Sequence, residues 1–492
     1  MRNFIFFLIF TFVFFRCINP NTKDTYESEF NLQYTSNVQT INSIENEYSH
    51  FGIQFNGMPF HENVQYENLD IEDLLDNLQI VIKEASALGL KWARVSVDWS
   101  SVEDNQGVFH WEILDEIVDG LVEKNIEIYL CLHGGHKTHT GFLSPVSDEQ
   151  LKAWSVYASN VISRYKNQID YWEIWNEANT IWFWKPEPNA EEYINLVKFT
   201  RKIIDELDPG STVIGGGVAR LDVPFAEKCF QLGIADYINV FSFHPYSAIP
   251  ESVVKKVTMQ VKTPELYMPV SHTVDGLFDL VEASGKDIEI WQGECGYPSA
   301  MNSLGWNGTG PWSETIQSKW ILRMGLTDLA FEAPVSCYFL MKEAPGSGEQ
   351  KNAKGLLKLE DNSRKPSYYV YQNLISVLRG KIHLNNKISI TKEMLDPGSF
   401  SGMQQKDIMS LCLENEKSQK FIAWWLVTRI QSEVTPARIN LTLDNIKDFN
   451  NPKLFDLLTG KIYTISDYEF SEERVILRSM PVSDFPFLIS WE

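Results

Sequence analysis

Residues 171–184 read YWEIWNEANTIWFW, a short apolar run that leads directly into an Asn, a Glu and a group of aromatic side chains. A Glu that ends an apolar strand beside tryptophans has its charged form disfavoured by desolvation, so its pKa can approach the working pH. Glu177 therefore has the surroundings of a proton donor, provided that a second carboxylate faces it.

This run is one of eight. From residue 50 to about residue 378, short apolar runs alternate with longer segments of helical periodicity, which is a βα repeat. The strand candidates are HFGIQFNG from 50, KWARVSV from 91, IEIYLCL from 126, IDYWEIW from 169, TVIGGG from 212, YINVFSF from 237, DIEIWQ from 287 and PVSCYFLM from 334. Eight such units over roughly 330 residues match a (β/α)8 TIM barrel. The rival fold is a doubly wound open sheet, but the glycines of TVIGGG lack its dinucleotide-binding spacing.

The sequence pattern divides the chain into four segments. After about residue 380 the chain changes to alternating strands and turns, as in ARINLTLDNI and RVILRSM, which predicts a small β-sandwich. We expect a leader at 1–18, a linker rich in Asn, Thr, Ser and Glu at 19–49, the catalytic barrel at 50–380 and the β-sandwich at 381–492.

The leader reads MRNFIFFLIFTFVFFRC, a basic residue followed by an apolar stretch too short for an ordinary membrane span. It predicts a signal peptide and a secreted, periplasmic or cell-surface protein. Arg16 stands where a small residue is usual before a cleavage site, so a lipid on Cys17 and a retained signal anchor stay open. Membrane attachment is expected only through this leader or a lipid.

Composition restricts the partners. The chain has 65 acidic and 43 basic residues and a formal charge of -22, which argues against binding to nucleic acid. Five scattered cysteines follow the leader and none has a metal-ligand spacing, so we expect mostly small buried hydrophobic residues, with a disulfide possible. No metal and no organic cofactor is expected.

The active site of a TIM barrel lies where the strands end at the C-terminal face. The polar residues at those strand ends are Arg94, His133, Asn176, Glu177, His244, Tyr246 and Glu294. Glu177 follows the fourth strand and Glu294 the seventh, and these two ends lie across the barrel mouth from each other. They are the predicted catalytic pair.

Two carboxylates about 5 Å apart are what a retaining glycosidase requires. Glu294 would attack the anomeric carbon, while Glu177 protonates the departing oxygen and later deprotonates water. The alternative is a carbohydrate-binding barrel without catalysis, against which the intact pair argues. Phosphate-binding chemistry would need a glycine-rich loop after the seventh or eighth strand, for which Gly346 and Gly348 are a faint candidate.

These positions resemble glycoside hydrolase clan A, the retaining barrel enzymes whose acid/base follows strand four in an Asn-Glu pair and whose nucleophile follows strand seven. The segments EIWNEANTIWFW and EEYINLVKFTRKIIDELDPGSTVIGGG resemble family 39, which includes β-xylosidases, although Ala178 replaces its usual Pro. The segments FHPY, LH and GECGYPS look more like family 5, which holds β-glucanases and β-mannanases. Both families stay open.

The resemblance implies a role for each remaining strand-end residue. Asn176 would donate to the sugar 2-hydroxyl, and Arg94 would hold Glu294 ionised. Tyr246, which with His244 matches a His-x-Tyr pattern, would bring its hydroxyl near the nucleophile, and His133 would line the subsite floor. After strand eight the clan commonly presents a Trp as a sugar platform, where this chain offers Leu340, Met341, Lys342 and Glu343.

Four tryptophans, Trp182, Trp184, Trp306 and Trp312, lie in predicted loops around the barrel mouth. Such rings either stack on sugars or pack inside the protein. The expected substrate is a neutral polysaccharide or oligosaccharide, because an acidic surface disfavours sulfated or uronate-rich polymers. One buried Arg or Lys could still bind a single uronate.

Overall fold

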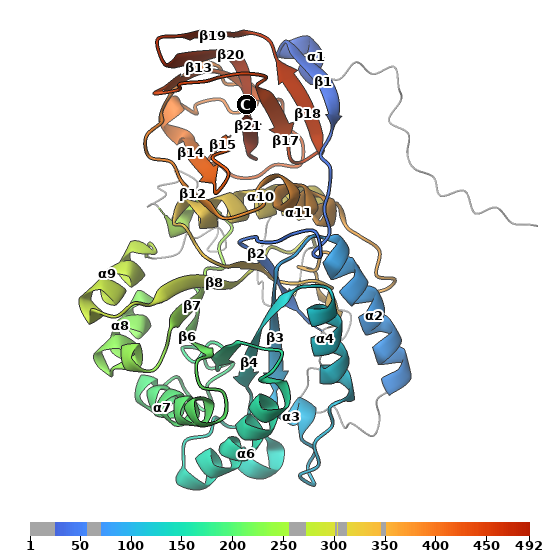
Figure 1. Cartoon of the computed structure of the whole chain (residues 1–492), viewed down its shortest axis with the longest axis vertical. Coiled ribbons are helices and arrows are strands. Elements are labelled where there is room, and N and C mark those ends of the chain that lie inside the picture. The colour runs from blue at the N-terminus through green and yellow to red at the C-terminus, as the bar shows by residue number, and fades with distance from the viewer. Residues whose placement is uncertain (1–24, 57–69, 255–271, 301–302, 304–311, 346–350) are drawn as a thin grey trace, which may run out of the picture.

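The computed structural model describes residues 25–56, 70–254, 272–300, 303, 312–345 and 351–492. A barrel of strands surrounded by helices lies at one end of the molecule, and a pair of antiparallel sheets lies at the other (Figure 1). The predicted leader, Trp306, Gly346 and Gly348 fall outside the described residues.

Eight parallel strands close into the barrel. They are β2 (Phe51–Phe55), β3 (Trp92–Asp98), β4 (Glu127–His133), β5 (Tyr171–Ile174), β6 (Thr212–Ala219), β7 (Val240–His244), β8 (Glu289–Cys295) and β9 (Ser336–Tyr338). Each overlaps one of the eight predicted runs, and β3, β4, β6, β7 and β8 extend past the C-terminal end of their run, so the predicted (β/α)8 fold is confirmed. Parallel strands under a layer of helices are buried on both faces, which explains why these runs are almost continuously apolar.

Helices between the strands cover the outside of the barrel (Figure 1). They are α2 (Ile71–Ala87), α4 (Glu112–Glu123), α6 (Asp148–Tyr165), α7 (Ala190–Leu207), α8 (Val223–Gln231), α9 (Asp275–Ser284), α10 (Glu314–Ala330) and α11 (Pro366–Val377). Shorter turns are α3 (Trp99–Val102), α5 (Lys137–Thr140), η2 (Ile234–Asp236) and η3 (Pro250–Val253). Helix α6 begins at a capping box in which Ser147 and Gln150 satisfy each other's backbone N–H groups.

Aromatic rings fill the N-terminal end of the barrel. Trp92, Tyr171 and Trp291 pack against one another with ring centroids 5.1, 5.3 and 5.7 Å apart. Alternate residues of a strand share a face, so Arg94 on β3 and Glu173 on β5 lie one layer above these rings. The charged groups of the barrel interior therefore rest on a packed aromatic floor.

Two antiparallel sheets follow the barrel, one of seven strands and one of four. Their strands after the barrel are β12 (Ile382–Leu384), β13 (Ser389–Asp396), β14 (Ile408–Asn415), β15 (Lys420–Leu426), β16 (Ala437–Asp444), β17 (Lys453–Asp456), β18 (Lys461–Ile465), β19 (Tyr468–Ser471), β20 (Arg474–Val482) and β21 (Phe487–Ser490), with a short turn η5 (Gln405–Asp407). A separate hairpin pairs β10 (Ala344–Pro345) with β11 (Lys351–Asn352). Buried and partly exposed residues alternate along β16, as expected when one face of a sheet covers a core.

Part of the predicted linker is a strand. After α1 (Thr25–Glu29), β1 (Leu32–Asn37) pairs antiparallel with β18, with Leu32 opposite Ile465, at the edge of the seven-stranded sheet. The linker prediction for 19–49 is therefore wrong for this stretch. Only the first residue of β1 is buried, so backbone pairing holds the strand, and its side chains carry no hydrophobic alternation that the sequence could reveal.

Helix α10 lies between the barrel and the sheets (Figure 1). Residues 316–329 are all buried, which explains why this helix lacks a polar face. Lys319 donates to Asp484 at 2.9 Å, and Arg323 donates to the carbonyl oxygen of Thr428 at 2.7 Å. Buried charged bonds thus join the helix to the C-terminal region.

The five cysteines of the described chain, Cys131, Cys229, Cys295, Cys337 and Cys412, are free and buried, in agreement with the predicted small hydrophobic residues. Among the described helices, none combines the length and the apolar character needed to cross a bilayer.

Candidate active site

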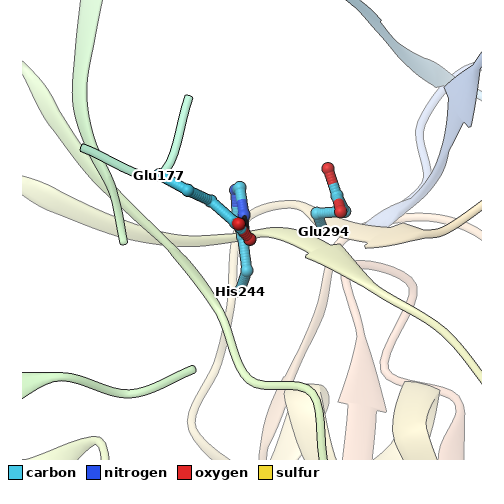
Figure 2. A group of neighbouring side chains, drawn as sticks. All are labelled: Glu177, His244 and Glu294. Carbon is cyan, nitrogen blue, oxygen red and sulfur yellow. Dashed lines mark hydrogen bonds and ion pairs between the residues drawn. The ribbon is translucent and has the colours of Figure 1, made fainter. Parts of the chain in front are cut away.

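Glu177 and Glu294 face each other at the C-terminal end of the barrel. Glu177 follows β5, and Glu294 lies next to the last residue of β8. One oxygen of each carboxylate and one ring nitrogen of His244 all lie within 4.8 Å of one another, and Figure 2 shows Glu177 beside His244 with Glu294 to their right. Two strand ends that are far apart in the sequence thus place two acids within reach of one small group.

The backbone around Glu177 has an uncommon conformation, with φ of 70° at Trp175 and 47° at Glu177. Such angles cost about 1–3 kcal/mol each and persist only where the surroundings fix them. The N–H of Trp175 donates to the carbonyl of Leu132, and that of Glu177 to the carbonyl of Gly217, both at 2.8 Å. Neighbouring strands therefore hold the turn that aims Glu177.

Gly217 explains the glycine run of β6. Its φ is 50°, and a Cβ there would lie 3.2 Å from the carbonyl oxygen of Trp175 and 3.2 Å from Oε1 of Glu173. The run lets β6 pass close to the turn that carries Glu177, so the glycines serve the site by leaving room.

His244 is the partner of Glu177. Its Nδ1 lies 2.9 Å from Oε1 of Glu177, and its side chain is completely buried. A neutral imidazole can donate to a carboxylate or accept from a carboxylic acid, depending on its tautomer. His244 can thus keep Glu177 in one orientation in both of its protonation states.

Glu294 has a different environment, because each of its oxygens accepts a hydrogen bond. Nη1 of Arg94 donates to Oε2 at 2.8 Å, and the hydroxyl of Tyr246 donates to Oε1 at 2.5 Å. Burial and the nearby Glu294 charge raise the pKa of Tyr246 well above its ordinary value, so the hydroxyl keeps its proton. These two charge-assisted or short hydrogen bonds fix the position of the Glu294 carboxylate.

Arg94 is itself held on several sides. Its Nε donates to Glu173 at 2.6 Å, its Nη1 to Gln54 at 2.9 Å and its Nη2 to Oδ1 of Asn176 at 2.8 Å. Burial opposes its charge, but Glu173 and Glu294 raise the pKa of Arg94 well above its ordinary value. Sequence reasoning missed Glu173 and Gln54. Glu173 could have been found from the strand period of two, because it lies two residues after Tyr171 and therefore on the same face of β5.

The predicted aromatic residues separate into different environments. Trp182 is 79% exposed, whereas Trp184 is fully buried against Trp175 and Tyr193. Trp184 therefore presents no ring face to a sugar, and its prediction as a substrate-binding residue is wrong because its ring belongs to the core. Trp312 is partly buried, with its ring 5.3 Å from that of Tyr297.

His133 at the end of β4 is buried beside the site. Burial and then the charge of Arg94 lower its pKa to about 3, so it is neutral at physiological pH. Among the described residues its Nε2 has no hydrogen-bond partner. A neutral, buried ring of this kind is available to a ligand only as a hydrogen-bonding group.

The end of the eighth barrel strand presents a Phe. Leu340 and Met341 are buried, and Lys342 donates to Asn77 at 3.0 Å. Phe339 is only partly buried, and its ring lies edge-on to that of Tyr246 at 6.3 Å. Sequence reasoning missed this ring, which is the aromatic group that the strand brings to the site.

The donor atoms of Glu177, His244 and Glu294 are also close enough for a metal ion. They already have protein partners, since His244 bonds to Glu177 and the oxygens of Glu294 accept from Arg94 and Tyr246. A cation would displace these bonds and face the guanidinium of Arg94. The cluster therefore suits proton transfer and nucleophilic attack better than metal binding.

Comparison with known proteins finds glycoside hydrolases of similar fold. No protein-family model matches it. A β-xylosidase of Geobacillus stearothermophilus is 26% identical in an alignment that covers 28% of this chain and 31% of that protein, so the chain matches about a third of this relative's length. A family 39 glycoside hydrolase from Bacteroides cellulosilyticus WH2 has a TM-score of 0.63 and 17% identity, over 92% of this chain and 83% of that one.

A family 39 enzyme from Xanthomonas axonopodis pv. citri has a TM-score of 0.54 and 14% identity, over 94% of this chain and 97% of that one. Both structural likenesses extend over the barrel and the sheets together. The chain therefore has the same fold as these family 39 glycoside hydrolases.

Proposed function

We propose that the protein is a retaining β-glycosidase that hydrolyses a polysaccharide or oligosaccharide by double displacement. The observation that carries this proposal is the pair Glu177 and Glu294, which bring one carboxylate oxygen each to within 4.8 Å of one another. Retaining enzymes need two carboxyl groups about 5 Å apart, whereas inverting enzymes need about 6.5–9.5 Å to admit a water molecule. The distant β-xylosidase relative and the family 39 fold agree with this chemistry.

In the first step, an oxygen of Glu294 attacks the anomeric carbon and forms a glycosyl ester, while Glu177 gives its proton to the departing oxygen. Arg94 and Tyr246 support Glu294 as the nucleophile because their hydrogen bonds stabilise a carboxylate and fix its position. Glu177 has no such cation among its described contacts and faces His244, which suits the acid.

In the second step, Glu177 accepts a proton from water, and that water breaks the ester to Glu294. Its bond to His244 lets the carboxylate keep its position after the first proton has left. The Oδ1 of Asn176 accepts from Arg94, which orients the amide group so that its NH2 can donate to the sugar 2-hydroxyl.

The proposed substrate is a polysaccharide or an oligosaccharide. The acidic surface favours a chain that is neutral over most of its length. The exposed ring of Trp182 is suited to stack on a sugar next to the cleaved bond. The apolar leader at 1–18 supports export to the exterior, the periplasm or the cell surface, and no cofactor enters the reaction.

A carbohydrate-binding protein without catalysis is the second candidate. It would require the barrel mouth but not the two acids or the hydrogen bonds that orient them. The contacts from Arg94, Tyr246 and His244 converge on the two carboxylates, which favours the enzyme.

The test is hydrolysis of a panel of aryl β-glycosides and β-glucans by the wild type, Glu177→Ala and Glu294→Ala, with sodium azide present. Azide should rescue Glu294→Ala with an α-glycosyl azide as product and rescue Glu177→Ala with a β-glycosyl azide. Activity that survives both substitutions would place the chemistry elsewhere. A wild type that binds glycans but cleaves none would favour the binding protein.

A further inference from the structure

Lys354 adds a buried cation to the surroundings of the nucleophile. Lys354 follows β11 and is 3% exposed. Its Nζ lies 5.7 Å from the ring centroid of Tyr246 and 5.7 Å from that of Phe339. Since the hydroxyl of Tyr246 bonds to Glu294, the ammonium group stands just beyond the reaction centre.

The position of Lys354 is fixed by its own contacts. Its carbonyl oxygen accepts from the hydroxyl of Tyr338 at 2.7 Å and from Nε2 of Gln317 at 3.0 Å, and its Nζ lies 3.4 Å from Oδ1 of Asn352. A Cβ on Gly296 would lie 2.0 Å from the carbonyl oxygen of Phe339 and 3.3 Å from Cδ of Lys354, so the glycine leaves room chiefly for the Phe339 backbone and also for the Lys354 side chain. The cation is thus part of a built site.

Lys354 is charged under ordinary conditions. Burial lowers its pKa to about 8, against the opposing effect of Glu294 and Glu177, which favour the ammonium form. Most molecules therefore carry this charge at neutral pH.

The two sides of Glu294 indicate which part of a sugar would meet Lys354. The oxygen Oε2 bonds to Arg94, which bonds to Asn176, whereas Oε1 bonds to Tyr246. The anomeric carbon of a pyranose is flanked by C2 on one side and by the ring oxygen and C5 on the other. With the 2-hydroxyl on Asn176, the C5 substituent lies on the side of Tyr246 and Lys354.

We infer that Lys354 binds a carboxylate on C5 of the sugar whose glycosidic bond is cleaved. The enzyme would therefore prefer a hexuronoside, in which this sugar is a single uronate and the rest of the saccharide is neutral. This inference rests on the proposed glycosidase function. A pentose has no substituent at C5 and a hexose offers only a hydroxyl, but a uronate forms a charged hydrogen bond in a site shielded from water.

The charges of the site agree with this specificity. When Glu177 holds its proton, the two negative charges of Glu173 and Glu294 exceed the single positive charge of Arg94. An anionic sugar would be repelled by that excess, and the ammonium group of Lys354 cancels it. A neutral sugar would need no such compensation.

The experiment compares 4-nitrophenyl β-D-glucuronide with the β-D-glucoside and the β-D-xyloside at about pH 6.5, where Lys354 is charged. The wild type should have the highest kcat/KM for the glucuronide. In Lys354→Met the ratio of glucuronide to glucoside kcat/KM should fall by at least about ten-fold, mainly through KM, and Lys354→Arg should restore part of it. Lys342→Met is the control from the same connection, and it should keep the wild-type ratio.

Calorimetric binding of D-glucuronate and D-glucose to the wild type and to Lys354→Met separates this inference from the proposed function. Hydrolysis of neutral glycosides with a ratio that Lys354→Met does not change would overturn the uronate assignment and leave the glycosidase standing. Glucuronate binding that requires Lys354, without hydrolysis of any glycoside, would support the site and reject the enzyme. Absence of both binding and hydrolysis would reject both.

Discussion

Nε of Arg94 lies 2.6 Å from Oε2 of Glu173, and both side chains are almost completely excluded from solvent. This ion pair fixes the plane of the guanidinium, whose Nη1 then points at Glu294. Under the proposed mechanism Glu173 is a positioning residue, because it acts on Glu294, the proposed nucleophile, through Arg94.

Replacing Glu173 by Gln should loosen Arg94. We expect Glu173→Gln to lower kcat by about 100-fold, since small displacements of catalytic groups have effects of that size, and to lower the free energy of unfolding by about 3 kcal/mol. Steady-state kinetics and urea denaturation measure the two effects. Glu127→Gln is the control, because Glu127 is nearly half exposed and lies 3.7 Å from Lys91, so it should cost less than about 1 kcal/mol. A wild-type kcat in Glu173→Gln would contradict the positioning role.

The hydroxyl of Tyr246 should matter for the rate more than for stability. Tyr246→Phe removes the 2.5 Å bond to Glu294, and kcat should fall by about ten-fold to a hundred-fold. The matched control is Tyr157→Phe, whose buried hydroxyl donates to the carbonyl of Val97 at 2.6 Å away from both carboxylates. That control should lose about 1 kcal/mol of stability and keep its kcat. Equal kcat in the two variants would exclude a role for the Tyr246 hydroxyl.

Truncation of the two tryptophans after Glu177 should affect different properties: protein stability for Trp184 and substrate binding for Trp182. Trp184→Ala empties a core position, so the free energy of unfolding should drop by about 3–5 kcal/mol. Trp182→Ala alters an exposed ring and should change stability by less than about 0.5 kcal/mol while it raises KM for oligosaccharides. Thermal unfolding and KM for an oligosaccharide series test the pair, and an unchanged KM would mean that Trp182 contacts no sugar.

Asp328 on α10 should make stability depend on pH. Burial raises its pKa to about 7, while its Oδ2 accepts from Gln292 at 3.1 Å and from Ser336 at 2.6 Å. Between about pH 4 and pH 7 the folded protein holds this proton and the unfolded chain has lost it, so this group's contribution to stability falls as pH rises through that window.

Asp328→Asn keeps an acceptor and removes the titration. The variant should be more stable than the wild type at about pH 8, by roughly 1–3 kcal/mol, and the advantage should shrink toward about pH 4. Urea denaturation at several pH values provides the comparison. Parallel stability profiles for the two proteins would show that Asp328 does not titrate in this range.

The barrel could be predicted because its information is local. Each strand is a compact apolar run, and the barrel geometry then brings strand ends such as Glu177 and Glu294 together from positions far apart in the chain. The supporting residues were harder to find. Glu173 stands within the most informative stretch of the sequence, but it was hidden among apolar neighbours, and its role depends on Arg94 from another strand.

Other residues lie in irregular segments, whose sequence has no periodicity from which the direction of a side chain could be predicted. Lys354 and Phe339 reach the site from the connection after the last barrel strand, where neither alternation nor helical spacing indicates direction. Trp182 and Trp184 differ completely in exposure although they are two residues apart in the same loop, because tertiary packing decides which ring is covered.

The pairing of β1 with β18 has a consequence for biosynthesis. The ribosome synthesises β1 before any barrel strand, and it synthesises β18 only after the whole barrel. The strand β1 therefore stays without its partner through most of translation, until Leu32 can pair with Ile465. The barrel can begin to form in the meantime, since its strands pair with neighbours in the chain. Completion of the seven-stranded sheet is therefore a late event, because it requires strands that are translated after the whole barrel.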